Sequence, residues 1–375
     1  MAKFIVHIGD GKCGSSAIQA ALFDAQATLH QAGLAYTSHH RTSGNFCMGT
    51  LLGKSTRGND VHQKAFARQT IAQLQAQLST SDYIVISSEA FLTLGPEQVV
   101  TILQMITPDI ERIDVIAYVR DPLGMYLSLA QQAIKASYRF PRPDTYARPL
   151  DQLLGQWQSC PKIDSVTVRI FDRKKLIGTN VVADVEQVLK TLTGKQGFHL
   201  EQINENSSLS AEQMVALQDY RRRFCHEIDG KSAPRSSRLI DFFTTMNEAG
   251  LVGTKPQLSP AAATLIVQGN ADIIQRLNDR YGFTMECRAA LSDEIPQNNN
   301  WAHISSILSE VRSDYVHHLK MLVPGFNPAL ENGNMEKALR SMHKLIEMEP
   351  KKKDAIERAA TVYWNTEAIA GITSS

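Results

Sequence analysis

Short runs of apolar and β-branched residues are the feature that most constrains how this chain can fold. Three of these runs, at residues 4–8, 83–86 and 113–119, are almost wholly apolar, and each is followed by a turn and a helix-like segment. Strands that are buried on both faces have this pattern. A fourth run, Ser165–Ile170, alternates more. Strands that alternate with helices predict an α/β fold with a central parallel sheet, and such sheets bind ligands at the carboxyl ends of their strands.

The second half of the chain has a different pattern, because strand-like runs stop at about residue 210 and helical periodicity follows. We expect helices, several of them beginning at a serine that can cap the first turn, at residues 210–224, 236–249, 259–281 and 301–322. The expected architecture is therefore an α/β domain with a helical C-terminal half.

The end of the chain resembles a single tetratricopeptide helix pair, with a helix at residues 335–348, a proline break and a second helix. One repeat cannot bury its apolar face alone. We therefore interpret the pair as a packing appendage or as a dimer contact that would make the protein a homo-oligomer, in preference to a peptide-binding array. We expect two domains, the α/β domain with its helical extension at residues 1–283 and the helical appendage at 284–375. The polar stretch 292–300 is the candidate linker.

Charge and composition exclude several function classes. The 375 residues are 43% hydrophobic and carry 39 basic against 38 acidic side chains, so the chain lacks the electrostatic footprint of a nucleic-acid binder. The basic runs at 221–223 and 351–353 are interpreted as solvated helix faces. Five dispersed cysteines without a CxxC pair indicate a reducing compartment and neither a zinc site nor a disulfide framework. No signal peptide or membrane span is expected, which favours a cytoplasmic location.

A glycine-rich loop follows the first expected strand, in the segment FIVHIGDGKCGSSAIQAAL. Gly9, Gly11 and Gly14 allow the backbone to curl closely around a ligand, while Ser15 and Ser16 can cap the following helix and donate hydroxyl groups. Backbone N–H groups at the positive end of a helix dipole bind anions. The loop is therefore a candidate phosphate site, and the alternative is a tight turn without a ligand.

The lysine of this loop is not where ATP- and GTP-binding loops have it. Those loops follow the pattern GxxxxGK with Ser or Thr, so their lysine comes after the last glycine. Here Lys12 lies two residues before Gly14, and Ser15 follows the glycine. A lysine inside the loop would lie over the terminal group of the ligand, and no magnesium site need accompany it. We therefore expect no metal.

A second constellation follows the third expected strand, in the segment DVIAYVRDPLGMYLSLAQQAIK. Arg120 comes directly after the strand, at the same sheet edge as the glycine loop, where a guanidinium can hold a second phosphate with two hydrogen bonds. Asp121 can cap the next helix, Pro122 suits its first position, and Ser128 adds a hydroxyl two turns further on. The alternative is that Arg120 pairs with Asp121 at the start of the helix.

Together the two constellations resemble the sulfotransferases that use 3′-phosphoadenosine 5′-phosphosulfate (PAPS). In that family a GxxKxG loop followed by Ser or Thr binds the 5′-phosphosulfate, and an arginine with a serine eight residues further on binds the 3′-phosphate. GDGKCGSS and the pair Arg120 and Ser128 match these two motifs. A bacterial group with HIGxxKTGSTSIQ openings is the most similar, and it shares the SSE at residues 87–89 and the RDP at 120–122. The resemblance covers residues 3–283 and implies a three-layer, P-loop-like fold.

The resemblance also implies the reaction, which is transfer of a sulfuryl group from PAPS to an acceptor hydroxyl by in-line displacement. It assigns the binding of PAPS to Gly11, Lys12, Cys13, Gly14, Ser15 and Ser16 in the loop and to Arg120 and Ser128 beyond it. Lys12, with the N–H groups of the loop, would stabilise the negative charge that grows on the departing nucleotide.

The general base, which takes the proton of the acceptor, is left open by the sequence. The family uses a histidine or a glutamate, and many members of the bacterial group have a histidine after an asparagine that corresponds to Asn45. In this chain Phe46 follows Asn45, so that position is empty. His39, His40 and Glu89 are therefore the candidates for the base.

Two further residues near the loop have ambiguous roles. Cys13 stands where the bacterial group usually has threonine, and a thiol at a helix N-terminus beside Lys12 is expected to have a lowered pKa. The alternative is a small residue that fills the loop. His7 lies inside the preceding strand and is interpreted as a hydrogen-bonded core imidazole rather than a catalyst.

The resemblance favours a carbohydrate hydroxyl as acceptor, on a polysaccharide, a lipid-linked sugar or a smaller glycoconjugate. Loops at residues 37–60 and 137–149 and the helical half are expected to set the acceptor specificity. Two other functions stay open. One is an ATP-dependent P-loop kinase, which the missing GKS or GKT disfavours, and the other is a catalytically inactive nucleotide-binding scaffold.

Overall fold

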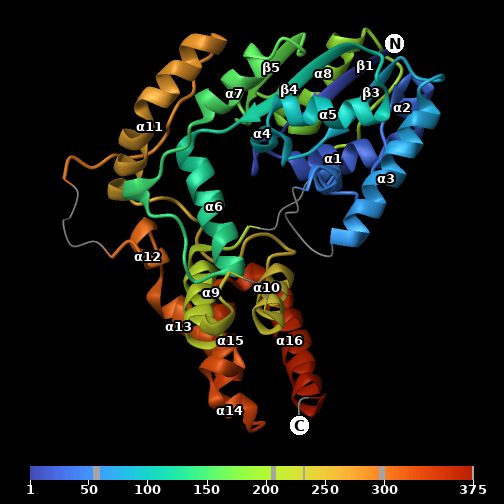
Figure 1. The fold of residues 1–375 in the computed structure, drawn as a ribbon. Coiled ribbons are helices and arrows are strands. Elements are labelled where there is room, and N and C mark those ends of the chain that lie inside the picture. Colours follow the sequence, from blue (N-terminus) through green and yellow to red (C-terminus); the bar gives the residue numbers. More distant parts are fainter. Residues whose placement is uncertain (54–59, 204–207, 231–232, 295–299, 374–375) are drawn as a thin grey trace. The chain divides into compact units, whose positions relative to one another are not determined.

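The computed structural model describes residues 1–53, 60–203, 208–230, 233–294 and 300–373, and the chain divides into two compact units (Figure 1). The first unit consists of Met1–Asp121, Arg148–Glu205 and Asp272–Glu286. The second unit consists of Pro122–Ala147, Asn206–Ala271 and Cys287–Ser375. The chain therefore leaves the first unit and returns to it twice. The expected domain boundary after residue 283 stays a prediction, because the two units describe packing and do not test which segments fold independently.

The first unit is built on a five-stranded sheet in which every neighbouring pair of strands is parallel. The strands are β1 (Ala2–His7), β2 (Leu34–Ala35), β3 (Tyr83–Ser87), β4 (Ile110–Val119) and β5 (Ser165–Ile170). Their spatial order is β2-β3-β1-β4-β5, and Figure 1 labels β1, β3, β4 and β5. The four expected strands and the α/β class are confirmed. The strand β2 was not expected, because two residues make no recognisable hydrophobic pattern.

Several helices belong to the first unit. They are α1 (Ser15–Asp24), α2 (Gln26–Gln31), α3 (Asp60–Gln77), α4 (Phe91–Leu94), α5 (Pro96–Ile106), α7 (Leu150–Ser159), α8 (Val181–Thr193) and the end of α11 (Pro260–Tyr281), with 3₁₀ turns η1 (Phe46–Leu52) and η3 (Ile177–Thr179).

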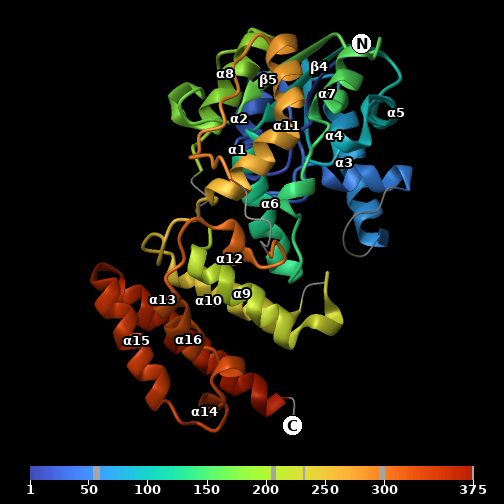
Figure 2. The same cartoon turned by 90° about the vertical axis from the view of Figure 1, so that its left-hand side faces the viewer.

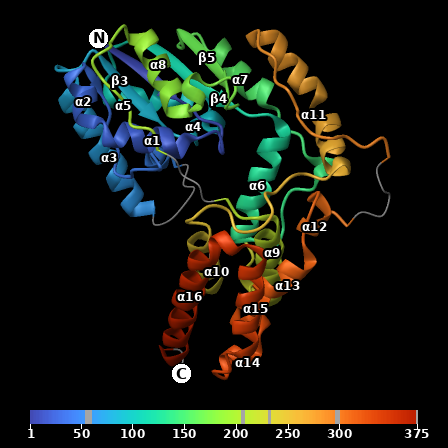
Figure 3. The ribbon, with the colours of Figure 1, turned by 180° about the vertical axis from the view of Figure 1, so that it is seen from behind.

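These helices cover both faces of the sheet. On one face, strand residues such as Val6, Ile86 and Val115 form the main apolar core together with α3, α5, α7 and the end of α11. On the other face α1 packs against α8 (Figure 3), and Tyr118 of β4 donates a hydrogen bond to Asp184 of α8 at 2.8 Å. Alternate positions of each strand thus face two different helix layers, which explains why the strands are apolar almost throughout.

The second unit is helical. Its elements are α6 (Pro122–Ala136), α9 (Ala211–Phe224), α10 (Pro234–Met246), the start of α11, α12 (Ile304–Ile307), α13 (Ser313–Met321), α14 (Pro328–Glu331), α15 (Glu336–Met348) and α16 (Lys353–Thr373), with 3₁₀ turns η2 (Pro143–Thr145), η4 (His226–Ile228), η5 (Pro324–Phe326) and η6 (Pro350–Lys352). The serine cap expected for α9 is confirmed: Ser210 and Gln213 exchange side-chain and backbone hydrogen bonds in a capping box.

The continuous helix expected at residues 301–322 is wrong, because α12 and α13 are separated by an extended segment. Leu308 forms an antiparallel bridge with Leu258, and the N–H of Ser309 donates to the carbonyl of Gln257 at 2.9 Å. These hydrogen bonds to a distant segment replace the ones that a continuous helix would have made.

The C-terminal helices pack within the second unit (Figure 2). Helix α15 packs against α13, and α16 packs against α10, where the rings of Phe242 and Tyr363 stack at 4.7 Å. Packing as an appendage is therefore observed, while a dimer contact stays a prediction. None of the helices in the described ranges is long and apolar enough to cross a membrane.

Two smaller expectations concern the second unit. The interpretation of residues 221–223 as a solvated face is wrong for Arg221, which is fully buried and donates to the hydroxyl of Ser236 at 2.6 Å. The sequence could not reveal this burial, because it depends on the packing of α9 against α6 and α10. Most of the candidate linker at 292–300 lies outside the described residues, since 295–299 are not among them.

A buried carboxylate ties β4, β5 and α8 together in the first unit. Asp184 accepts hydrogen bonds from Tyr118, from the guanidinium of Arg169 at 2.9 and 2.5 Å, and from the backbone N–H of Ile177 at 2.9 Å. Burial by itself raises the pKa of Asp184, but the hydrogen bonds with Arg169, Ile177 and Tyr118 outweigh it and hold the pKa below its usual value. Its charged form is thus the one that the fold stabilises.

Replacing Asp184 with Asn should lower the free energy of unfolding of the first unit by roughly 2 kcal/mol, since Arg169 and the N–H of Ile177 lose a charged acceptor. The difference from wild type should shrink as the pH falls through the folded pKa of Asp184, where the wild-type carboxylate also loses its charge. Urea unfolding at several pH values measures both effects.

The fluorescence of Trp157, which is fully buried in the first unit, can report this unfolding when Trp301 and Trp364 are replaced by Phe. Asp272→Asn is the matched control, because Asp272 is an exposed aspartate of the same unit, and its effect should stay within about 0.5 kcal/mol. Equal effects of the two substitutions would contradict the role assigned to Asp184.

Candidate functional site

The glycine loop and Arg120 lie at adjacent carboxyl ends of the parallel sheet. β1 and β4 are neighbours, with His7 paired to Ile116. After β1 the chain continues towards β2 on one side of the sheet, and after β4 it continues towards β5 on the other side. In open α/β sheets, ligands bind where the connections diverge in this way. The strand order therefore puts the loop at the edge position that is best suited to a ligand.

The backbone of the loop is strained in a way that only some residues tolerate. Lys12 has a positive φ of 67°, which is uncommon for a residue other than glycine. Gly14 has a φ of 80°, and a Cβ there would lie 2.8 Å from side-chain atoms of both Phe171 and Val181. Strain of this kind persists where the surrounding structure holds it and is common at ligand sites. The surrounding loop thus holds the backbone of Lys12 at its positive φ.

The first turn of α1 follows the loop and has no side-chain cap. Gly14 is the N-cap residue, so the expectation that Ser15 or Ser16 caps the helix is wrong: both lie inside the first turn. This turn contains no acidic residue, and the first N–H groups of any helix have no partner within it. The Ser15 hydroxyl is buried, with a relative exposure of 1%, and has no hydrogen-bond partner. Donors arranged in this way are suited to an anion.

His7 lies beneath the loop as a neutral imidazole. Its Nδ1 is hydrogen-bonded to the hydroxyl of Ser87 at 2.7 Å, and burial lowers its pKa to about 4. A Cβ on Gly9 would lie 3.3 Å from Nε2 of His7 and 2.5 Å from the hydroxyl oxygen of Ser15, and neither of these atoms has a hydrogen-bond partner. The interpretation of His7 as a hydrogen-bonded core residue is confirmed, and glycine is required at position 9.

Arg120 contacts the loop directly. It follows the last residue of β4, and its Nη1 donates to the carbonyl oxygen of Lys12 at 3.3 Å, while its guanidinium lies 5.6 Å from the ring centroid of Phe171. The expected placement of Arg120 beside the loop is confirmed. Pro122 is the first residue of α6, as expected. Ser128 lies on α6 in the second unit, so its pairing with Arg120 stays a prediction.

Sequence reasoning missed an ion pair at the loop between Asp10 and Arg148. The two side chains form two hydrogen bonds, Nη1 to Oδ2 at 2.5 Å and Nη2 to Oδ1 at 2.6 Å. Asp10 is 3% exposed and is also hydrogen-bonded by the N–H of Gly11. The signal in the sequence was an acidic residue inside a candidate phosphate loop, where a counter-ion is expected, but nothing local identifies a partner 138 positions away.

The thiol of Cys13 is not activated. It is fully buried, and burial raises its pKa well above the usual value, with the charge of Asp10 acting in the same direction and those of Arg120 and Arg148 opposing. The expectation of a lowered pKa is therefore wrong. The helix N-terminus was the right environment, but removal from water disfavours the thiolate more than the helix dipole favours it.

The three candidates for a general base are not equivalent in position. A Cβ placed on Gly11 would lie 3.8 Å from a carboxylate oxygen of Glu89, so this exposed carboxylate lies against the loop. His39 and His40 pack on the ring of Phe66 in α3, with centroids 4.7 and 5.5 Å apart. Burial, together with the charge of His40, lowers the pKa of His39.

Asn45 anchors the segment that carries the two histidines. Its side-chain amide donates to the carbonyl of Thr37 at 2.7 Å and accepts from the N–H of Ser87 at 2.9 Å. The asparagine therefore joins this segment to the carboxyl end of β3. The rest of the expected acceptor loop at 37–60 is only partly described, because 54–59 lie outside the described residues.

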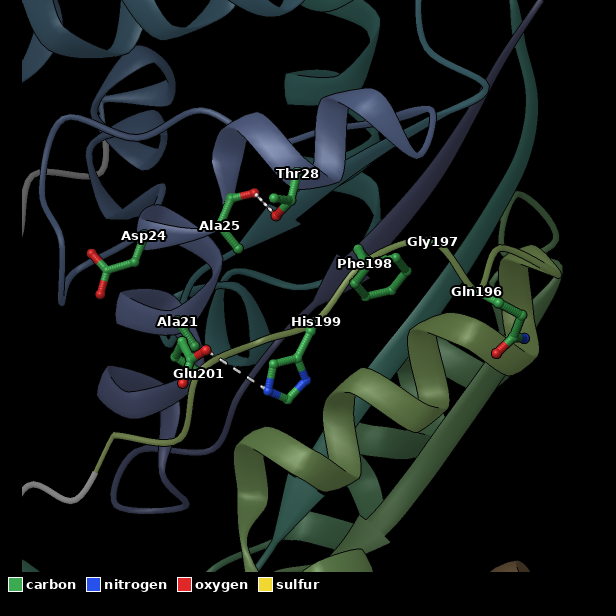
Figure 4. A pocket seen from close by; sticks show the side chains of 9 residues that line it. All are labelled: Ala21, Asp24, Ala25, Thr28, Gln196, Gly197, Phe198, His199 and Glu201. Atoms are coloured by element: carbon green, nitrogen blue, oxygen red, sulfur yellow. Dashed lines mark hydrogen bonds and ion pairs between the residues drawn. The ribbon is translucent and has the colours of Figure 1, made fainter.

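A pocket of about 510 Å³ lies at the far end of α1 from the loop, between α1, α2 and the segment after α8. Figure 4 shows its lining, with His199 directed toward Glu201. Its main polar side chains are already paired: Asp24 with Arg41 at 2.9 Å, and His199 with Glu186 at 2.9 Å. The pocket therefore offers less for chemistry than the loop does.

No protein-family model matches this chain, and no curated protein or solved structure is significantly similar to it. The resemblance to the sulfotransferases therefore rests on the two motifs and on the residues around them.

Cys13 should be inert toward a thiol reagent in the folded protein, because its thiol is buried and protonated. We expect iodoacetamide to label Cys13 at least about 100 times more slowly than it labels a free thiol, as measured by peptide mapping. Cys287, which is partly exposed, is the internal control that confirms reagent activity. Rapid labelling of Cys13 in the native protein would contradict the buried position.

Proposed function

We propose that this protein is a sulfotransferase that moves a sulfuryl group from PAPS to a hydroxyl group of a carbohydrate or glycoconjugate. The observation that carries the proposal is a glycine loop with an internal lysine, at the divergence point of a parallel sheet, with Arg120 hydrogen-bonded to that same loop. The strand order with the loop directly after β1 supports a P-loop-like, three-layer fold as part of this proposal.

The residues present fit the charges of PAPS. The unpartnered hydroxyl of Ser15, the first N–H groups of α1 and the ammonium of Lys12 suit the 5′-phosphosulfate. Arg120 uses Nη1 in its hydrogen bond to the loop, and a guanidinium has five N–H donors, so it can also hold the 3′-phosphate. Ser128 completes this second site in the proposal.

The chemistry follows from these positions. PAPS supplies the sulfuryl group, the acceptor oxygen forms the new bond to sulfur, and the bond between sulfur and the nucleotide's bridging oxygen breaks. Lys12 and the hydroxyl of Ser15 donate to the phosphate that gains negative charge, which lowers the barrier where charge develops. Glu89 takes the proton of the acceptor, since it is the candidate base that lies against the loop.

The desulfated product, 3′-phosphoadenosine 5′-phosphate (PAP), should bind with micromolar affinity, and Arg120→Ala should weaken that affinity by about 100-fold or more, because a charged hydrogen-bonding partner of the 3′-phosphate is lost. Isothermal titration calorimetry measures both values. Arg68→Ala, which removes an exposed arginine of α3, is the matched control and should bind like wild type.

ATP, which lacks a 3′-phosphate, should bind much more weakly than PAP in the same titrations. Comparable ATP binding with magnesium-dependent turnover would instead support the P-loop kinase. Absence of PAP binding by a folded protein would remove the sulfotransferase proposal.

Glu89→Gln should lower the rate of transfer by about 100-fold or more while changing the affinity for PAP less than about threefold, because the amide keeps the shape but cannot accept the proton. The rate is measured as PAP released from PAPS with a panel of oligosaccharide acceptors. His39→Gln and His40→Gln are the matched comparisons and should stay within about threefold of wild type. Loss of activity in a histidine variant instead would assign the base to that histidine. PAP binding by wild type without any turnover on the panel would favour the inactive scaffold.

A further inference from the structure

An aspartate inside the proposed phosphate loop is unexpected, because its charge opposes an anionic ligand. Asp10 lies between the two glycines at positions 9 and 11, and its backbone carbonyl accepts a hydrogen bond from the N–H of Cys13 at 3.2 Å. The side chain is almost completely buried. Water and salt therefore screen its charge much less than they would at the surface.

Arg148 is placed to cancel that charge. Its guanidinium forms two hydrogen bonds with the carboxylate of Asp10, in the planar arrangement that favours arginine over lysine. Arg148 is itself 26% exposed, so it reaches the loop from a partly solvated position. It is also the residue at which the chain returns to the first unit, just before α7 begins.

Other groups near Asp10 do not replace Arg148 as a counter-ion. His7, which precedes the loop, is neutral at physiological pH, because burial lowers its pKa to about 4. Burial raises the pKa of the Cys13 thiol, which therefore stays protonated, and the N–H of Gly11 brings only a dipole.

The remaining charged groups around the loop have other contacts. Arg120 donates to the carbonyl of Lys12, and its charge reaches Cys13, as do those of Glu89 and Arg148. Lys12 lies two residues beyond Asp10 in the loop. In the described part of the chain, the Asp10 carboxylate is thus hydrogen-bonded to one charged group, the guanidinium of Arg148, and to the neutral N–H of Gly11.

We propose that Arg148 is a positioning residue for the proposed reaction: it neutralises Asp10 and so keeps the glycine loop able to accept an anion. The inference rests on the proposed function, since the anion is the phosphosulfate of PAPS. The carboxylate of Asp10 accepts a hydrogen bond from the N–H of Gly11 and so holds the loop in its turn conformation. Arg148 offsets the repulsion that the negative charge of Asp10 would exert on an anionic ligand. Arg148 acts through Asp10 and does not itself touch the ligand.

The test is calorimetric titration of PAP into wild type, Arg148→Ala, Asp10→Asn and the double variant at pH 7.5. Arg148→Ala should bind at least about tenfold more weakly, because Asp10 is then a buried, uncompensated charge beside the ligand. Adding Asp10→Asn to Arg148→Ala should restore the affinity to within about threefold of wild type. A residue that contacts PAP directly, or one that only supports the fold, would not be rescued by this neutral substitution.

The pH dependence provides a second readout. Burial raises the pKa of Asp10 and Arg148 opposes that shift, so the pKa should rise further when Arg148 is removed. The ratio of the dissociation constants of Arg148→Ala and wild type should therefore fall toward one as the pH is lowered and the uncompensated Asp10 takes up a proton. Using the ratio cancels the titration of PAP itself. Lys162→Ala is the control, since it breaks an exposed ion pair with Glu97 of α5 in the same unit, and its ratio should stay near one at every pH.

Each outcome has a separate meaning. If wild type does not bind PAP, the proposed function fails, whatever the variants do. If wild type binds and Arg148→Ala binds equally well, or if the double variant stays weak, the role of Arg148 is overturned. If Arg148→Ala does not fold, as judged by circular dichroism, the decision passes to the folded double variant and to Arg148→Lys. Arg148→Lys should bind with intermediate affinity, because it keeps the charge but not the paired hydrogen bonds.

Discussion

The burial of a parallel sheet on both faces is the constraint on which the rest of the first unit depends. Because α1 and α8 cover one face and α3, α5 and α7 the other, the backbone groups of the strands must pair with one another, and ligands can reach the sheet only at its edges. Parallel strands place all their carboxyl ends at the same edge. The glycine loop after β1 and Arg120 after β4 meet there for that reason.

The chain as a whole is nearly neutral, so the charge at this edge depends on the side chains around the glycine loop. Arg120 is hydrogen-bonded to the loop at the carbonyl of Lys12, Asp10 is paired with Arg148, and the buried groups His7 and Cys13 are held uncharged by desolvation. Arg120 and Arg148 thus bring positive charge to the loop in a chain whose formal net charge is only +1. The unpartnered hydroxyl of Ser15 and the uncapped start of α1 give the loop directional hydrogen-bond donors.

The errors of sequence reasoning have a common physical cause. Ser15 and Ser16 were expected as caps, but the positive φ of Gly14 makes the glycine the N-cap. Cys13 was expected to ionise easily, but the packing around it removes it from water. Residues 301–322 were expected as one helix, but hydrogen bonds to residues 257–259 break it. In each case, contacts with distant segments override a local preference.

The sequence by itself determined four of the five strands, their alternation with helices, the loop and the position of Arg120. Apolar periodicity is local, and the direction of a parallel strand decides at which edge of the sheet it ends. Only the tertiary structure decided that Arg148 is the partner of Asp10, that Glu89 lies against the loop, and that His39 packs on Phe66. These facts depend on side chains that are far apart in sequence and brought together by packing, so no local pattern could encode them.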